Sequence, residues 1–238
     1  TAGDLVKYEA AAAAVTTTAT ATPARFTTAT GWTVALDTAL VLLGPVYLYG
    51  GGERADTWGL LDVLGPGVAY AHPADATFDR GPVLGDVLDQ YVVDLLDPNP
   101  TSLGIVPGVE GTMATMELHL HPPGFTALGS PLAELERLGG HTFVLEGTAR
   151  RGGTSIPFAA RGHLEGEPTQ RVIESIEVAV ELDDREDRPG RLVIHVRIDE
   201  WFRFVDFDRL EDRPDPFAPE TVAGAALRRG IRSRFAYG

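Results

Sequence analysis

Apolar side chains alternate with polar ones over residues 171–183 and again over residues 191–199. Successive side chains of a β-strand point to opposite faces, so a period of two predicts strands with one dry side and one wet side. The two stretches follow one another across a charged turn at 184–190. They therefore predict neighbouring strands of an antiparallel sheet that packs on a single face. The apolar positions are Val172, Ile176, Val178, Val180 and Leu182, then Leu192, Ile194, Val196 and Ile198.

An earlier strand pattern, over residues 31–49, is interrupted once. Trp32, Val34 and Leu36 alternate with Thr33, Ala35 and Asp37, and an apolar run then continues to residue 49 with a break at Gly44-Pro45. Proline has no amide hydrogen to donate to a sheet ladder. This dipeptide therefore predicts a bulge, a sheet edge or a corner at which the chain changes sheets.

Further along, the chain shows a clear hairpin pattern. Residues 141–149 and 154–164 flank the turn Arg150-Arg151-Gly152-Gly153. Residues 87–96 are either a strand or a short helix, and their Tyr-Val-Val centre favours a strand. Short strands at regular spacing predict an all-β fold, a mostly antiparallel β-sandwich with one or two short helices.

Two short helices are expected beside these strands. One covers residues 131–138, with Ser130 as its N-cap and Gly139 after its end. The other lies near residues 219–229, where Pro219 and Glu220 mark its start.

The N-terminal region has a biased composition. Residues 10–24 are an alanine and threonine tract; the alanines favour a helix and the threonines oppose it. We interpret residues 1–25 as a tether or an edge segment, followed by a single β-sandwich domain over residues 26–238. A division into two domains near residues 98–110 is the alternative.

Composition excludes several classes of function. The 238 residues include 20 lysines and arginines against 34 acidic residues, a formal net charge of −14, which disfavours nucleic acid and anionic membranes and attracts cations. The absence of cysteine excludes disulfides, thiolate catalysis and cysteine-ligated zinc. No apolar run reaches the roughly 18–20 residues of a spanning helix, so no transmembrane segment is expected.

The clearest pointer to chemistry is Glu117-Leu118-His119-Leu120-His121. On a strand, Glu117, His119 and His121 share one face, and two imidazoles beside a carboxylate can form part of a divalent-metal site. The loop around His72 is the expected donor of a further ligand. The sequence therefore predicts a copper or zinc site made of His72, Glu117, His119 and His121. An ordinary amphipathic strand with a solvated polar side is the alternative.

The remaining candidates favour structural roles. His141 is expected at the edge of the core with a backbone hydrogen bond, and His163 and His195 on polar faces. The aromatic group of Trp201, Phe202, Phe204 and Phe207 predicts a core plug, with a sugar-stacking platform as the alternative. No serine stands in a nucleophile motif, so no catalytic residue and no enzymatic activity are predicted.

Five phrases of the chain resemble a group of exported lipoproteins from myxobacteria and related bacteria, for which no activity is known to us. The resemblance implies an exported protein, periplasmic or tethered to the outer membrane, with a lipid anchor upstream of Thr1. Members of the group carry a second histidine in a phrase A-H-P-G-H, where this chain has Asp75, a carboxylate in place of an imidazole. The phrases are GWTVALDTALVLLGPVYLY, AHPADATFDRGPVLGDVLDQYVVDLL, VPGVEGTMATMELHL, VLEGTARRGGTSIPF and WFRFVDFDRL.

These observations predict an exported, envelope-tethered β-sandwich that binds copper or zinc through its His-x-His strand face. Its expected partners are the metal ion or an envelope protein. The alternative is a non-catalytic structural or adhesion module that binds a protein or a glycan.

Overall fold

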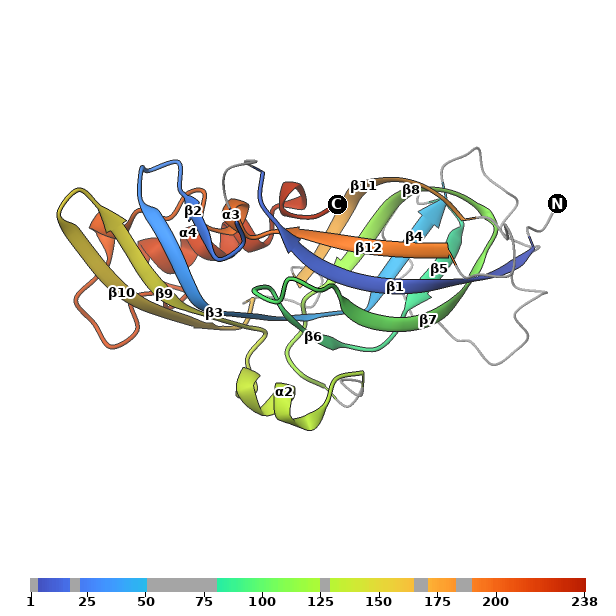
Figure 1. The fold of residues 1–238 in the computed structure, drawn as a ribbon, viewed down its shortest axis with the longest axis horizontal. Coiled ribbons are helices and arrows are strands. Elements are labelled where there is room, and N and C mark those ends of the chain that lie inside the picture. The colour runs from blue at the N-terminus through green and yellow to red at the C-terminus, as the bar shows by residue number, and fades with distance from the viewer. Residues whose placement is uncertain (1–3, 18–21, 51–80, 125–128, 165–170, 183–189) are drawn as a thin grey trace.

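The structure is a computed structural model that describes residues 4–17, 22–50, 81–124, 129–164, 171–182 and 190–238 (Figure 1). Its strands form two curled sheets arranged as a sandwich. The strands are β1 (Leu5–Val15), β2 (Arg25–Thr27), β3 (Thr33–Leu43), β4 (Val46–Gly50), β5 (Val83–Val87), β6 (Tyr91–Asp94), β7 (Thr101–Val109), β8 (Gly111–His119), β9 (Phe143–Arg151), β10 (Thr154–Gly162), β11 (Val172–Leu182) and β12 (Gly190–Arg197). The helices are α2 (Leu132–Leu138), α3 (Ile198–Trp201) and α4 (Val222–Ile231), with 3-10 turns η2 (Phe207–Arg209) and η3 (Arg234–Ala236).

The larger sheet has seven strands in the order β11-β8-β4-β5-β7-β1-β12. The smaller has the order β10-β9-β3-β2, with β6 also paired to β3. All of these pairs are antiparallel except β1 with β12, which is parallel. The expectation of a mostly antiparallel β-sandwich is confirmed, with three short α-helices in the described residues rather than one or two.

Gly44-Pro45 is the point at which the chain changes sheets. The dipeptide joins β3 of the smaller sheet to β4 of the larger one, and its peptide bond is cis. Gly44 has φ +117°, and a Cβ there would lie 2.2 Å from the backbone oxygen of Asp89. Glycine is needed at this corner because a side chain would meet that carbonyl. Of the three predicted alternatives, the change of sheet is the one that the structure shows.

The first strand corrects the expectation of an N-terminal tether. Strand β1 lies inside the larger sheet, paired on one side with β7 and on the other with β12. Val6, Tyr8, Ala10 and Ala12 are buried, while alternate residues from Leu5 to Glu9 are exposed. Leu5–Val15 therefore form an interior strand of the sheet, neither a tether nor an edge segment. Polar and apolar residues alternate only over the first half of this strand. The alanines at 10–14 that follow show no alternation, so the sequence does not reveal a strand there.

The strands predicted at 171–183 and 191–199 exist as β11 and β12, but they are not neighbours. They form the two opposite edges of the larger sheet, and β12 pairs in parallel with β1. The second strand ends at Arg197, because α3 begins at Ile198. Nearness in sequence favours pairing but does not decide it, and here β1 takes the position beside β12.

The predicted hairpin is confirmed as β9 and β10. Leu145 lies opposite Ala160, and the strands turn at Gly152-Gly153 between Arg151 and Thr154. Gly152 has φ +57°, a conformation that glycine adopts at little cost in a two-residue hairpin turn.

The predicted helices are present, with different start signals. Helix α2 ends at Gly139, which has a left-handed conformation. Ser130 is not its N-cap, because the Ser130 hydroxyl accepts a hydrogen bond from the amide of Val92 in β6 at 2.7 Å. Helix α4 begins at Val222, and the Thr221 side chain caps it by accepting from the amide of Gly224 at 2.9 Å. No helix among the described residues is long and apolar enough to span a membrane.

An aromatic cluster fills the space between the smaller sheet and helices α3 and α4, which lie along one face of that sheet (Figure 1). Trp201, Phe202 and Phe207 are at most 1% exposed. The expectation of a core plug is confirmed for these three, whereas Phe204 is 48% exposed. Other members of the cluster are Phe26, Trp32, Phe158 and Phe217.

Candidate functional site

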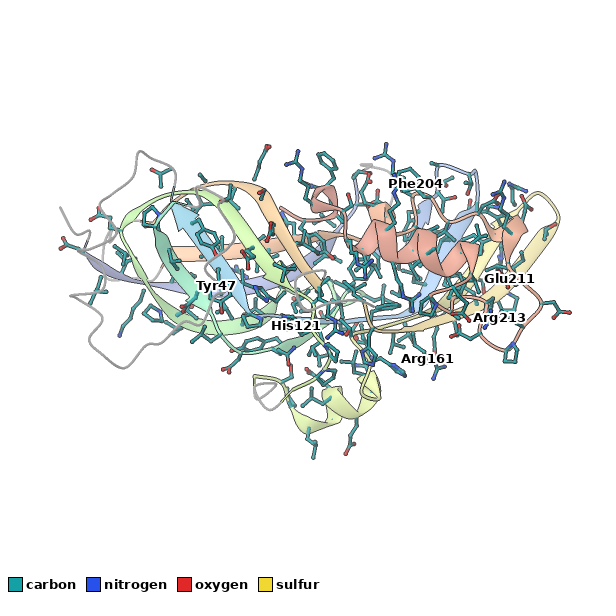
Figure 2. The ribbon with its side chains drawn as sticks, turned by 180° about the vertical axis from the view of Figure 1, so that it is seen from behind. Tyr47, His121, Arg161, Phe204, Glu211 and Arg213 are labelled. Atoms are coloured by element: carbon teal, nitrogen blue, oxygen red, sulfur yellow. The ribbon has the colours of Figure 1, made fainter. Side chains whose placement is uncertain are left out.

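Strand β8 lies between β4 and β11 in the larger sheet and carries the Glu-x-His-x-His segment. Leu118 and Leu120 are fully buried on the core side of the strand. The other side of the strand carries Glu117, His119 and His121. Glu117 contacts His119, and His119 contacts His121, so the prediction that the three share one face is confirmed. His121 lies two residues beyond the end of β8, near the middle of the molecule (Figure 2).

The three side chains form one hydrogen-bonded chain. Glu117 Oε1 is 2.7 Å from His119 Nε2, and His119 Nδ1 is 3.0 Å from His121 Nε2. The Tyr49 hydroxyl donates to Glu117 Oε2 at 3.3 Å. Tyr47, which lies opposite Glu117 across the β4–β8 pair, packs its ring edge against His119 with centroids 5.3 Å apart.

This face of β8 is not a solvated one. Glu117 is 2% exposed and His119 is 9% exposed. A carboxylate is rarely buried without strong partners, because removing its charge from water is costly. The alternative of an ordinary solvent-facing strand is therefore wrong for these two residues.

The Glu117 carboxylate contacts one nitrogen of His119 and so influences the tautomer of that ring. If Glu117 is ionised it only accepts, which places the proton on His119 Nε2 and directs the lone pair of Nδ1 in a neutral ring at His121. Burial lowers the pKa of His121, and the charges of His119 and Arg171 lower it further. His121 is therefore neutral at pH 7. In one tautomer its Nε2 donates to His119 Nδ1; in the other, Nε2 carries a lone pair that faces the lone pair of His119 Nδ1.

In that second tautomer the two nitrogens can share one metal ion. His119 Nδ1 and His121 Nε2 would then be the two protein nitrogens that hold it. Glu117 contacts the far nitrogen of the His119 ring. It would then act as the carboxylate that orients a metal-ligating histidine rather than as a ligand itself.

The described residues do not complete such a site. Among them there is no group of three or more His, Asp or Glu side chains that could hold a metal ion. His72 and Asp75, the expected loop donors, lie outside the described residues. What the described structure brings together is the pair His119 and His121 with Glu117 behind it.

Sequence reasoning missed the two tyrosines of β4. Tyr47 and Tyr49 alternate with the buried Val46 and Leu48, which is a readable period of two. Their contact with β8 depends on the β4–β8 register, which alternation alone does not specify.

A second histidine pair lies at the β9–β10 end of the smaller sheet. The rings of His141 and His163 have centroids 5.7 Å apart, and His163 Nδ1 is 3.2 Å from the Thr142 hydroxyl. The buried Nδ1 of His141 has no hydrogen-bond partner in the described part of the chain, so the expected backbone bond of that ring is not confirmed. His195 is exposed on β12.

Comparisons with known proteins identify no family. No family model matches the chain, and no curated protein matches it. Among solved structures, MbnP from Methylosinus trichosporium is similar, with a TM-score of 0.48 and 11% identity over 96% of this chain and 88% of that chain. The resemblance to exported lipoproteins stays a prediction.

Proposed function

We propose that this β-sandwich is an exported protein that binds a copper or zinc ion through His119 and His121. The observation that carries the proposal is the pair of imidazole nitrogens 3.0 Å apart, with the outer nitrogen of His119 held by the buried Glu117. Two ligands of one metal ion stand at about this separation.

Two electrostatic features support metal binding. A lowered pKa keeps His121 neutral, and only a neutral imidazole offers a lone pair to a metal. The net charge of −14 raises the concentration of cations around the protein. The remaining ligand is expected from the segment that carries His72 and Asp75.

Nitrogen ligands favour copper over zinc. Divalent copper binds them more tightly than zinc in the general order of metal affinities. We therefore expect both metals to bind, and Cu(II) to bind more tightly.

Isothermal titration of the demetallated protein with Cu(II) and Zn(II) tests the proposal. The double variant His119→Ala with His121→Ala should lose the binding of one equivalent, because both nitrogen ligands are removed. His141→Ala with His163→Ala is the matched control, since it removes two adjacent histidines elsewhere and should bind as the wild type does. Unchanged binding by the first variant would reject the site.

Two other functions have weaker support. A sugar platform at Trp201 requires an exposed ring face, and Trp201 and Trp32 are both buried; Trp58 lies outside the described residues. We propose no enzymatic activity, because the sequence offers no activated nucleophile. Export and envelope tethering rest on the resemblance to lipoproteins.

A further inference from the structure

An open groove of about 820 Å³ lies along the C-terminal helices. One wall comes from Glu200 of α3 with Arg203 and Phe204 after it, and the other from α4 and from Phe235 of η3. Figure 2 shows Phe204 on the surface beside these helices. The groove is made of elements other than those that hold His119 and His121.

The groove reverses the charge of the rest of the molecule. Residues 221–238 contain four arginines and no aspartate or glutamate, in a chain whose formal net charge is −14. Four arginines line the groove against one glutamate. Arg228 is buried and donates to the backbone oxygen of Phe217 at 2.7 Å, so it has a structural role. Arg203 and Arg229 are exposed.

Aromatic rings hold these arginines at the surface. The guanidinium of Arg229 lies 5.1 Å from the centroid of the Phe204 ring, and that of Arg203 lies 5.6 Å from it. Arg203 is paired with Glu200 at 3.1 Å, whereas Arg229 has no carboxylate partner among the described residues. Its N–H groups are therefore available to an external anion.

The two phenylalanines add an apolar surface to the basic one. Phe204 is 48% exposed and Phe235 is 63% exposed, and both line the groove. Arginine and aromatic side chains together are typical of the centres of protein interfaces. A ligand that matches this surface carries both carboxylates and an apolar side chain.

We propose that the groove binds a short acidic peptide segment of a partner protein. A carboxylate of the segment pairs with Arg229, and an apolar side chain packs against Phe204 and Phe235. The acidic remainder of the molecule repels a broad anionic surface such as a bilayer. A short extended segment meets only the groove, so charge complementarity favours it over a membrane.

Fluorescence anisotropy with a labelled peptide of alternating glutamate and leucine tests this proposal on the full chain. We expect Arg229→Glu and Phe204→Ala each to weaken binding about tenfold, and added salt to weaken it as well. Arg150→Glu, the same charge change at an exposed arginine of β9, is the matched control and should leave the affinity unchanged. A peptide with lysine in place of glutamate should not bind.

Four results would overturn the proposal. They are equal binding of the lysine peptide, an equal loss on Arg150→Glu, Arg229-dependent binding of phosphatidylglycerol vesicles in place of the peptide, and Arg229-dependent self-association in sedimentation without peptide binding. Arg229→Lys keeps the charge and should retain part of the affinity. Far-UV circular dichroism of each variant checks that the fold is intact.

Discussion

Glu117 is the residue whose surroundings say most about the candidate site. It is a nearly inaccessible carboxylate on a sheet, and both of its oxygens have partners, His119 and Tyr49. A buried charge of this kind is retained at a cost in stability unless its partners compensate for desolvation. The arrangement is that of a carboxylate that orients a metal-binding imidazole.

Replacing Glu117 with glutamine tests that role. Glu117→Gln keeps the size of the side chain but removes the charge and allows the wrong His119 tautomer. We expect Cu(II) affinity to fall about 10- to 100-fold, the usual effect of losing such a partner. Isothermal titration measures it, with Glu177→Gln at an exposed position of β11 as the control. Equal affinity in Glu117→Gln and wild type would show that the carboxylate does not act through His119.

His121 makes the stability of the metal-free protein depend on pH. Burial, His119 and Arg171 lower its pKa in the folded state, whereas the unfolded chain keeps the usual value of about 6.5. Between these two pKa values the unfolded state binds more protons than the folded state. The contribution of His121 to stability is therefore intact above about pH 6.5 and is lost as the pH falls through the folded pKa.

Urea unfolding at about pH 8 and about pH 5, on either side of the usual histidine pKa, measures this effect. Metal-free wild type should lose more unfolding free energy on acidification than His121→Asn does. His195→Asn, which alters an exposed histidine of β12, should behave as wild type. The assignment to His121 fails if both variants lose the same free energy as wild type.

At the scale of elements, helix α4 illustrates how packing reverses a local preference. Gly224 and Gly230 lie inside the helix, where alanine is ordinarily the better helix former. A Cβ at Gly230 would stand 2.2 Å from the backbone oxygen of Trp201, and one at Gly224 would stand 2.0 Å from that of Ala218. The glycines therefore allow α4 to lie directly against neighbouring backbone.

We expect Gly230→Ala to lower the free energy of unfolding by about 1–3 kcal/mol, the usual cost of overpacking. Chemical denaturation measures the change. Gly153→Ala in the β9–β10 turn is the control, because no atom lies within 4 Å of the added Cβ. A stabilised Gly230→Ala variant would mean that α4 moves away from Trp201 without cost.

For the molecule as a whole, β1 brings the N-terminal residues next to a strand from the last quarter of the chain. Its pairing with β12 connects the first residues to residues 190–197, and its pairing with β7 completes the larger sheet. Pairing of strands so far apart in sequence carries a large loop-closure cost and depends on the rest of the fold. Removing β1 would expose the backbone groups of both neighbours.

Deletion of residues 1–15 should therefore abolish cooperative unfolding, whereas removal of a tether would leave it unchanged. Thermal melting followed by circular dichroism, together with size-exclusion chromatography, distinguishes the two. A synthetic peptide of residues 4–17, added to the truncated protein, should restore part of the transition by re-forming the strand. A truncated protein that melts as sharply as the full chain would show that β1 is dispensable.

The alternation of apolar and polar side chains determined most of the strand positions and which residues share a strand face. Strands β3, β4, β8, β11 and β12, the β9–β10 hairpin, the break at Gly44-Pro45 and the common face of Glu117, His119 and His121 follow from local rules, whereas β1, β5 and β7 were not predicted as strands. Each rule depends on a few consecutive residues, on the pleat of a strand or on the missing amide hydrogen of proline. The prediction at this level required no knowledge of distant contacts.

Only the tertiary structure decided which strands are neighbours and which polar side chains are buried. It placed β1 beside β12, buried Glu117 against Tyr49, and gathered Arg203, Arg229 and Phe204 into one groove. The physical reason is that periodicity is a property of one strand, whereas burial and pairing depend on segments that compete for the same position. A polar strand face can be covered by protein or by water, and its own sequence is the same in both cases.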